Sequence, residues 1–446
     1  MIRIYESTAA ADGILTRRTM STVDDVPTVV LSSIERVFGE ALTPEAAVAR
    51  LLADVRVRGD DALREWTSRI DGVTTDALEI PKQAWSEAYD NLSSDLRDAM
   101  SLSAERVRAF HALQPVPSWS SDAMGGMLGQ RLVPLERVGV YVPGGTAPLP
   151  SSLLMAAIPA RVAGVDEVVV CTPADRVTGL PSPLILAAAH IAGVDRLFAL
   201  GGALAVAAMA FGTASVPRVD KVVGAGGLFT TVAKRQAYGL VGLDGIYGPT
   251  ETVVVADDTA DPRWVAADLL AQAEHDVLAT AILLTPSRAL AEAVQSEVAS
   301  QASLLSRSDI IETSLAGQGG IVLTPDLATA VAEADAYAPE HLCLSVEDPG
   351  RWVDVIRNAG GIFIGEHSFE VLGDYVAGPS HIMPTGGSAR FKGPVNVLDF
   401  VKVINLIGLD AETAASLARD ADRIARAESL TAHAAAARWR ATGEVS

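Results

Sequence analysis

Cysteine and long apolar runs are both scarce in this chain of 446 residues. Only Cys171 and Cys343 are present, and neither belongs to a CxxC pair. Two cysteines cannot form a disulfide framework, so we expect a reducing, cytoplasmic environment. The most apolar stretch, residues 153–160, contains Pro159 and is too short to span a bilayer. The first six residues, MIRIYE, lack the apolar core of a secretory signal.

Basic residues are outnumbered, with 35 Lys and Arg against 55 Asp and Glu, which gives a net charge of −20. Such a surface repels nucleic acid and anionic membranes, so we expect neither as the main partner. Aromatic residues are few at 5%, but hydrophobic residues make up 49% of the chain. This content is enough for several buried cores, and the length suggests two to four domains.

Apolar residues recur at helical spacing over residues 44–112, until Pro115 and Pro117 break the pattern. From about residue 131, short apolar runs alternate with helical segments, which predicts βαβ units around parallel sheets. We expect strands at 138–142, 167–172, 196–200, 251–256, 281–285, 320–324, 341–345 and 361–364. We expect the intervening helices at 151–162, 183–192, 203–210, 262–275, 288–303 and 326–334.

These elements form two α/β blocks, at about 131–245 and 246–385, with a boundary in the loop at 244–248. Residues 411–441 are rich in alanine and predict a helical tail. The tail has too few apolar positions for a core of its own, so we infer that it docks elsewhere, with a partner subunit as one option.

Four of the seven histidines, His275, His341, His381 and His433, lie in motif-like surroundings late in the chain. Gln272 and His275 are three residues apart at the end of a predicted helix, which places both side chains on one face. An imidazole nitrogen and an amide oxygen suit a borderline metal with an open coordination position. The alternative is a solvated helix surface.

Glu340 and His341 follow Pro339 and begin a predicted strand, where adjacent side chains point to opposite faces. One of them could orient a water while the other accepts a proton, because the ordinary pKa of histidine lies near neutrality. The alternative is a surface pair at a strand edge. Asp374 and His381 lie in a loop rich in Gly and Pro whose length is typical of functional loops, although Asp374 could instead cap a turn.

Glu428 and His433 are five residues apart on the predicted tail helix and share only part of a face, so a solvated face is the alternative. Residues 224–227 (GAGG) contain part of a dinucleotide-binding fingerprint but lack the full GxGxxG spacing. Residues 143–145 (PGG) precede a predicted helix and could present backbone amides to an anion, or form a plain tight turn.

The order and spacing of several segments resemble the histidinol dehydrogenases, the zinc- and NAD-dependent enzymes of histidine biosynthesis. The resemblance covers nearly the whole chain from residue 141 onward. It is carried by YVPGG at 141–145, SLLMAAIPARVAGV at 152–165, FGTASVPRVDK at 211–221, AKRQ at 233–236, DLLAQAEHD at 268–276, APEHL at 338–342, and residues 373–385 and 427–433.

The resemblance implies roles for individual residues. Gln272, His275 and Asp374 match zinc ligands within one subunit, and His433 matches a ligand delivered by the tail of the neighbouring subunit. The implied assembly is an intertwined homodimer with shared active sites and one Zn²⁺ per subunit. His341 matches the base and Glu340 the residue that activates water. The implied substrate-binding set comprises Thr250, Gln272, His275, His341, Asp374, His381, Glu428 and His433.

The implied reaction is a two-step oxidation of L-histidinol to L-histidine through bound L-histidinaldehyde, with two hydrides passed to NAD. In this family zinc mainly orients the substrate. The implied α/β fold has two incomplete Rossmann-like domains with parallel-sheet cores. Its expected segments are an N-terminal helical segment (1–130) that packs with the second block, a cofactor-side domain (131–245), a domain with the zinc and catalytic residues (246–390), and a tail that reaches the partner (391–446).

The cofactor side departs from the family pattern. Tyr141 is kept, but Leu204 stands where Gln is usual and Gly227 where Asn is usual, and neither can supply an amide hydrogen bond. Thr250 replaces a usual Ser and keeps the hydroxyl, while Ser380 replaces a common Asn. We therefore expect weak NAD binding, a different binding pose, or a relative with a different role.

Three functions are compatible with these patterns. The first is an L-histidinol dehydrogenase with an altered cofactor site. The second is a related enzyme that oxidises another small polar alcohol, such as a sulfonated diol, but the retained Glu428 and His433 favour histidinol. The third is a redox-inactive protein that binds zinc and ligand, but the retained Glu340–His341 pair counts against it, because a binding protein needs no base.

Overall fold

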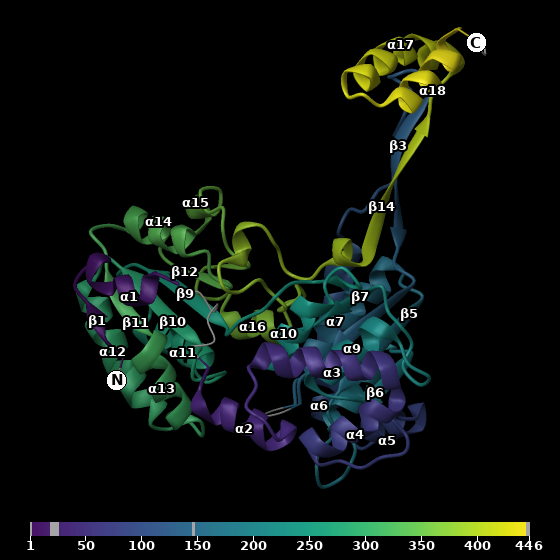
Figure 1. Ribbon diagram of the computed structural model, residues 1–446. Helices are drawn as coiled ribbons and strands as arrows, with labels where there is room; N and C mark the ends of the chain where they lie inside the picture. Colours follow the sequence, from purple (N-terminus) through teal and green to yellow (C-terminus); the bar gives the residue numbers. More distant parts are fainter. Residues whose placement is uncertain (1, 18–25, 145–147, 443–446) are drawn as a thin grey trace. The chain divides into compact units, whose positions relative to one another are not determined.

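The computed structural model describes residues 2–17, 26–144 and 148–442, so Gly145 of the predicted turn lies outside the described residues. The chain divides into two compact units (Figure 1). Unit 1 contains residues Met1–Leu113 and Glu136–Phe400, and unit 2 contains Gln114–Leu135 and Val401–Ser446. Each unit is described separately below.

The first sheet of unit 1 is fully parallel, with the strand order β6-β5-β4-β7-β8. Its strands are β4 (Arg137–Tyr141), β5 (Glu167–Thr172), β6 (Arg196–Ala199), β7 (Lys221–Val223) and β8 (Gly242–Leu243). The continuous run of buried valines in β5 is typical of a parallel strand that is covered on both faces.

Four helices connect these strands: α7 (Pro150–Ala163), α8 (Pro183–Ala192), α9 (Gly202–Phe211) and α10 (Leu228–Ala237). Proline at the first turn favours the start of α7 and α8, and the Ser182 hydroxyl caps α8 by accepting from the backbone N–H of Leu184. Helix α9 is almost wholly apolar and buried, which makes it the centre of the core of this block.

The N-terminal helices pack mainly on this first block. Helices α3 (Pro44–Arg58) and α4 (Asp60–Asp71) share its hydrophobic core, while α5 (Lys82–Asp90) and α6 (Ser94–Ala112) contact α8 and α7. The prediction that this segment packs with the second block is therefore wrong for α3, α4 and α5. Helix α6 also contacts the second block, because the Ser103 hydroxyl donates to the backbone oxygen of Tyr375 and Arg106 donates to that of Val376. Periodicity shows which face of a helix is apolar, but not which surface that face meets.

The second sheet of unit 1 is also parallel, with the order β1-β11-β10-β9-β12-β13. Its strands are β1 (Ile4–Tyr5), β9 (Glu251–Ala256), β10 (Thr280–Thr285), β11 (Gly320–Leu323), β12 (His341–Ser345) and β13 (Gly361–Ile364). Every residue of β9, β10 and β12 is buried. The very N-terminus of the chain thus joins this second block through β1.

Helices form two hydrophobic clusters on the second sheet. Helices α11 (Pro262–Ala273), α12 (Arg288–Ala302) and α13 (Ser308–Gln318) contribute to one cluster, and α1 (Asp12–Leu15) and α14 (Leu327–Tyr337) to the other. Three further α-helices of unit 1 are α2 (Thr28–Phe38), α15 (Gly350–Val353) and α16 (Glu370–Tyr375). The predicted α/β class with two parallel-sheet cores is confirmed, while the exact segment boundaries stay a prediction.

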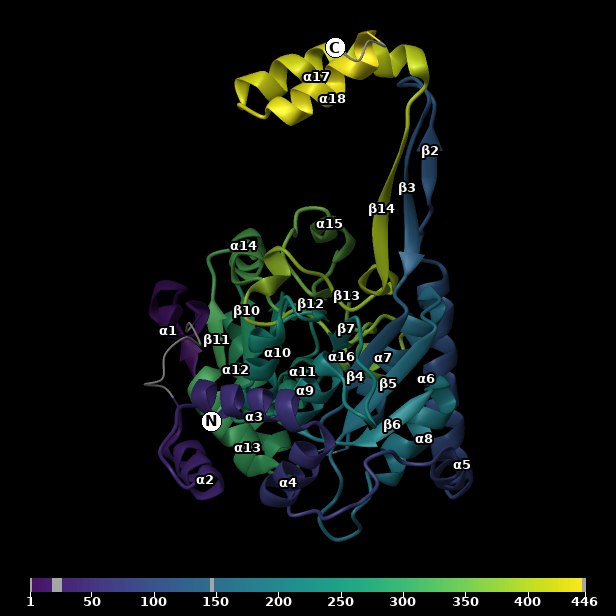
Figure 2. The same ribbon diagram turned by 45° about the vertical axis from the view of Figure 1, so that its right-hand side comes forward.

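Unit 2 consists of an antiparallel sheet and two helices (Figure 2). Strand β3 (Met127–Pro134) pairs with β2 (Trp119–Ser121) and β14 (Val401–Gly408), and α17 (Ala411–Ala427) packs on α18 (Thr431–Thr442). The predicted tail helix is interrupted at Ser429, which has a φ of 63°, so Glu428 and His433 lie on either side of a turn. Val403, Ile404 and Ile407 of β14 are exposed in this unit.

Among the described residues, no helix combines the length and apolar character that a membrane crossing requires.

Candidate active site

A pocket in unit 1 lies where edges of the two parallel sheets approach each other. Pro143 and Ala225 follow strands β4 and β7 of the first sheet, whereas Thr250 and Glu340 directly precede β9 and β12 of the second. The carboxyl edge of the first sheet therefore meets the amino edge of the second. Other lining residues are Leu149, Ser151, Ser152, Tyr247, Gly248, His275, His341, Asp374, Tyr375, His381, Ile382, Met383 and Thr385.

Glu340 and His341 both line this pocket, which corrects the prediction that they point to opposite faces. Glu340 lies before the first strand residue, so the alternation of strand side chains does not apply to it. His341 Nδ1 lies 3.8 Å from Glu340 Oε2 and 3.2 Å from the backbone oxygen of Glu251. Nδ1 must carry the proton to donate to that carbonyl, which leaves Nε2 as the basic nitrogen. Nε2 is buried and lacks a hydrogen-bond partner among the described residues.

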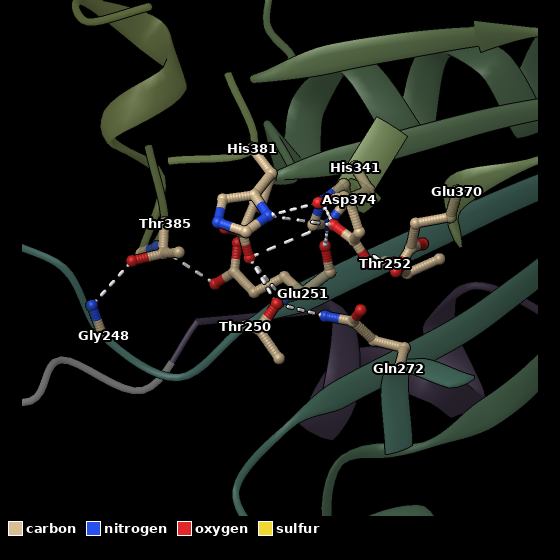
Figure 3. Close-up of polar contacts among 12 residues, drawn as sticks. Gly248, Thr250, Glu251, Thr252, Gln272, His341, Glu370, Asp374, His381 and Thr385 are labelled. Atoms are coloured by element: carbon tan, nitrogen blue, oxygen red, sulfur yellow. Dashed lines mark hydrogen bonds and ion pairs between the residues drawn. The ribbon is translucent and has the colours of Figure 1, made fainter. Parts of the chain in front are cut away.

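The carboxylate of Glu340 is buried and accepts two hydrogen bonds, one of them from Thr250 (labelled in Figure 3). The Thr250 hydroxyl donates to Glu340 Oε2 over 2.5 Å, and the backbone N–H of Glu251 donates to the same atom over 3.1 Å. Burial raises the pKa of Glu340 to about 7, although His341 and the two donors lower it. A carboxyl group with this pKa can take up and release a proton near neutral pH.

Gln272 is fully buried behind Thr250, whose hydroxyl its amide contacts. In the orientation that gives each amide atom a complementary partner, its nitrogen donates to Glu370 Oε1 over 2.5 Å and its oxygen accepts from the backbone N–H of Glu251 over 2.8 Å. The Thr252 hydroxyl also donates to Glu370. Burial, aided by the nearby Asp374, raises the pKa of Glu370 well above its usual range.

His275, Asp374 and His381 lie in the pocket together with His341. Asp374 Oδ1 is 3.9 Å from both His341 Nε2 and His381 Nδ1. His381 is anchored at both nitrogens, because Nδ1 lies 2.9 Å from the backbone oxygen of Asp374 and Nε2 lies 3.1 Å from the Ser152 hydroxyl. Burial lowers the pKa of His275 and of His381, which favours the neutral imidazoles that metals and hydrogen-bond donors require.

The predicted zinc ligands fit a metal in their donor chemistry. No cluster of three or more His, Cys, Asp or Glu residues able to hold a metal occurs within the described ranges. Of the predicted zinc ligands in unit 1, only His275 and Asp374 belong to these four residue types, and the third ligand is the amide of Gln272. Gln272 would have to exchange its present partners for the metal. His433 and Glu428 are exposed and belong to unit 2.

The predicted cofactor residues, Tyr141, Leu204 and Gly227, differ in how far they are buried. The Tyr141 hydroxyl, at the end of β4, accepts from the backbone N–H of Gly202 over 3.1 Å. Gly224 has a φ of 116°, and a Cβ there would lie 2.2 Å from the backbone oxygen of Tyr141, so only glycine fits. Gly227 is the N-cap residue directly before α10 and has open space beside it. Leu204 is 1% exposed and packs within the core cluster around α9, so it presents no side chain to the pocket.

A buried ion pair braces this cofactor side. Lys234 Nζ donates to Asp244 Oδ1 over 2.6 Å and to the backbone oxygen of Gly224 over 2.9 Å. Asp244 Oδ2 accepts from the backbone N–H of Gly224 over 2.7 Å and from the Tyr247 hydroxyl over 3.0 Å. The pair fixes both sides of the turn at Gly224, as paired and hydrogen-bonded buried charges can.

Sequence patterns alone did not identify three residues of this network: Ser152, Glu251 and Glu370. Ser152 and Glu251 lie inside recognisable segments but carry no motif of their own. The one available signal for Glu370 was its position four residues before Asp374, which places the two on one face of a helix. The replaced residue Ser380 has a structural role, because its hydroxyl donates to the backbone oxygen of Met155 over 3.0 Å.

A paired imidazole and carboxyl group in a pocket between two Rossmann-like sheets define an enzyme that moves protons at a bound substrate. A sequence model described as histidinol dehydrogenase matches residues 39–441. The chain belongs to the histidinol dehydrogenase family, and the predicted class of enzyme, a dehydrogenase of this type, is confirmed.

Individual relatives agree with this assignment. The chain is 51% identical to a histidinol dehydrogenase of Deinococcus radiodurans over 425 residues, which cover 95% of this chain and 96% of the relative. It is also 51% identical to that of Thermus thermophilus over 392 residues, which cover 88% and 93%. The crystal structure of histidinol dehydrogenase from Elizabethkingia anophelis matches with a TM-score of 0.89 at 30% identity and covers 98% of each chain.

Proposed function

We propose that this protein is a zinc-dependent L-histidinol dehydrogenase. It oxidises L-histidinol to L-histidine in two NAD-linked steps through bound L-histidinaldehyde. The observation that carries this proposal is the arrangement of His341, a residue that lines the pocket. Its Nδ1 is held by the Glu251 carbonyl, while its Nε2 lies 3.9 Å from Asp374 Oδ1 and has no hydrogen-bond partner among the described residues. This arrangement supplies one fixed base next to a second titratable group, Glu340.

The two residues divide the proton transfers. In the first step, His341 Nε2 accepts the hydroxyl proton of the alcohol as a hydride leaves the same carbon, and an aldehyde forms. His341 then releases this proton to solvent. In the second step, Glu340 accepts a proton from the water that adds to the aldehyde. His341 takes the remaining hydroxyl proton of the hydrate as a second hydride leaves, which yields the carboxylate.

We assign the zinc site to His275, Asp374 and Gln272, with His433 contributed by the second subunit of a homodimer. Zinc supplies a template that orients the amine and imidazole of the substrate. The exposed positions of His433 and Glu428 at the turn between α17 and α18 support their availability to another subunit. Exposed Val403, Ile404 and Ile407 on β14 support burial of this unit in an assembly. We expect the enzyme to act in the cytoplasm.

We assign NAD to the turns at the carboxyl edge of the first sheet. NAD held there would supply the hydride acceptor for both oxidations. The open N-terminus of α10, next to Gly227, offers backbone donors to a pyrophosphate. Leu204 offers no polar contact, so we expect a lower affinity for NAD than an amide at this position would give.

The decisive experiment measures NADH at 340 nm with zinc-loaded protein, excess NAD and limiting L-histidinol. About two NADH per histidinol are expected from the double oxidation. No NADH from folded, zinc-bound protein would overturn the proposal. Turnover of a sulfonated diol in place of histidinol would identify the related alcohol dehydrogenase, and tight histidinol binding without turnover would identify the redox-inactive relative.

A further inference from the structure

We infer that Arg17 is a positioning residue for the Glu340–His341 pair, an inference that rests on the proposed function. Arg17 precedes residues 39–441, the range that matches the family, so the family match does not assign it a role. It follows helix α1 in sequence, yet its guanidinium reaches three separate parts of the active-site framework.

The first contact is with the backbone that leads into the catalytic pair. Arg17 donates to the backbone oxygen of Tyr337 from Nε over 3.0 Å and from Nη2 over 2.7 Å. Nη2 also donates to the backbone oxygen of Ala338 over 2.9 Å. The guanidinium lies 4.0 Å from the centroid of the Tyr337 ring, close enough for a cation–π interaction.

The backbone that Arg17 contacts is strained at Ala338. Ala338 has a φ of 54° and a ψ of 61°, in the left-handed region that non-glycine residues rarely adopt. Such a conformation persists only when its surroundings hold it, and here it sets the direction in which Pro339 delivers Glu340 and His341. The carbonyl of Ala338 accepts a hydrogen bond from Arg17, so the strained residue is bonded directly to the guanidinium.

The second contact is with Glu251, which touches both catalytic residues. Arg17 Nη1 donates to Glu251 Oε1 in a largely buried ion pair. The backbone N–H of Glu251 donates to Glu340 Oε2, and its carbonyl accepts from His341 Nδ1. The side chain of Glu251 is therefore fixed by Arg17, while its backbone fixes the proton position of His341 and one oxygen of Glu340.

The third contact is with the turn at Gly386 and Gly387, which follows the pocket residue Thr385. The backbone N–H of Gly386 donates to the same Glu251 Oε1 over 3.1 Å. A Cβ at Gly387 would lie 3.2 Å from Arg17 Nε, so this turn packs closely against the guanidinium. The neighbouring Thr385 lines the pocket and accepts from the backbone N–H of Gly248 over 2.6 Å. One planar cation thus joins the segments at 251, 338 and 386.

This geometry requires a guanidinium. Arginine presents several donors in a fixed fork, whereas lysine offers a compact charge at a single point. Loss of the fork leaves Glu340 and His341 chemically intact but less well oriented, and a displacement of about 1 Å at a catalytic group can reduce turnover about 100-fold. The effect should therefore appear in kcat, while KM for histidinol and the zinc content change little.

The test compares Arg17→Met and Arg17→Lys with the control Arg3→Met in the full-length, zinc-loaded enzyme. Arg3 also lies near the N-terminus and also stacks on a tyrosine, at 4.9 Å from the Tyr5 ring centroid. We expect kcat to fall at least tenfold in Arg17→Met and by a smaller factor in Arg17→Lys. KM and zinc content should stay within about threefold of wild type, and Arg3→Met should keep wild-type kcat.

The outcomes separate this inference from the proposed function. If wild-type protein does not oxidise histidinol, the proposed function fails and the role of Arg17 fails with it. If wild type is active and Arg17→Met matches Arg3→Met in kcat, only the inference on Arg17 is overturned. Should Arg17→Met not fold, Arg17→Lys decides the question, because wild-type kcat in this variant would overturn the need for a guanidinium fork.

Discussion

His341 Nδ1 lies 3.2 Å from the backbone oxygen of Glu251, on the strand paired with its own. This contact fixes the imidazole tautomer, because a carbonyl oxygen can only accept a hydrogen bond. Nε2 is therefore left as the basic nitrogen by a backbone contact, because no carboxylate oxygen of the described residues lies within hydrogen-bond distance of Nδ1. Proton transfer in the proposed mechanism depends on this arrangement.

Replacement of His341 by asparagine should remove the base and preserve the fold. We expect kcat for histidinol oxidation to fall by about 10²–10⁴-fold, the usual contribution of a general base. Zinc content and the thermal unfolding temperature should stay close to wild type. His190→Asn, at an exposed site on α8, is the matched control. Wild-type turnover in His341→Asn would exclude His341 as the base.

Glu340→Gln should separate the two oxidations. The carboxylate form is the proton acceptor, and burial raises its pKa to about 7, so the aldehyde step should accelerate as pH rises through about 7. The variant should lose this pH dependence and release fewer than two NADH per histidinol, because the aldehyde accumulates. Stopped-flow measurement of NADH from pH 5.5 to 9 tests this expectation. Glu347→Gln, at an exposed position on the same segment, should behave as wild type.

Asp268 on α11 should make stability depend on pH. Burial, with a smaller contribution from Glu366, raises its pKa to about 7 from the ordinary value of 3.8. The native state keeps a proton between these pH values that the unfolded chain has lost, so this contribution to stability is present at acid pH and is lost as pH rises to about 7. Asp268→Asn should remove this pH-dependent loss of stability. The free energy of unfolding of the variant, relative to wild type, should therefore be higher at pH 8 than at pH 4 by up to about 4 kcal/mol.

Urea unfolding of wild type, Asp268→Asn and the control Asp258→Asn at pH 4, 6 and 8 measures this effect. Asp258 is exposed, so its variant should follow the wild-type pH dependence. An equal effect of Asp268→Asn at all three pH values would show that the carboxyl group does not titrate in this range.

Mixing His275→Ala with His433→Ala should restore activity if the sites are shared between subunits. Statistical exchange yields half hybrid dimers, each with one complete site, so about a quarter of wild-type activity is expected. A mixture of His275→Ala with Gln272→Ala is the control, because both substitutions fall in the same subunit's part of every site. If subunit exchange is demonstrated and the first mixture stays inactive, His433 does not act across subunits.

The local patterns were sufficient for most of the α/β elements. Buried runs of valine, leucine and isoleucine predicted β5, β9 and β10, and Pro262 after Asp261 marked the start of α11, where the Asp261 side chain caps the helix. These signals are local, since propensity and capping act within a few residues. Strand β14 was missed because its side chains are largely exposed in unit 2 and give no simple alternation.

The sequence by itself determined the two parallel-sheet blocks, the family, and the candidate residues Gln272, His275, Glu340, His341, Asp374 and His381, because each rests on a local pattern or a motif. Only the tertiary structure decided that Glu340 and His341 share one pocket, that α3 packs on the first block, and that Arg17 reaches Ala338 and Glu251. The physical reason is that hydropathy fixes which face of an element is buried, whereas long-range packing selects its partner.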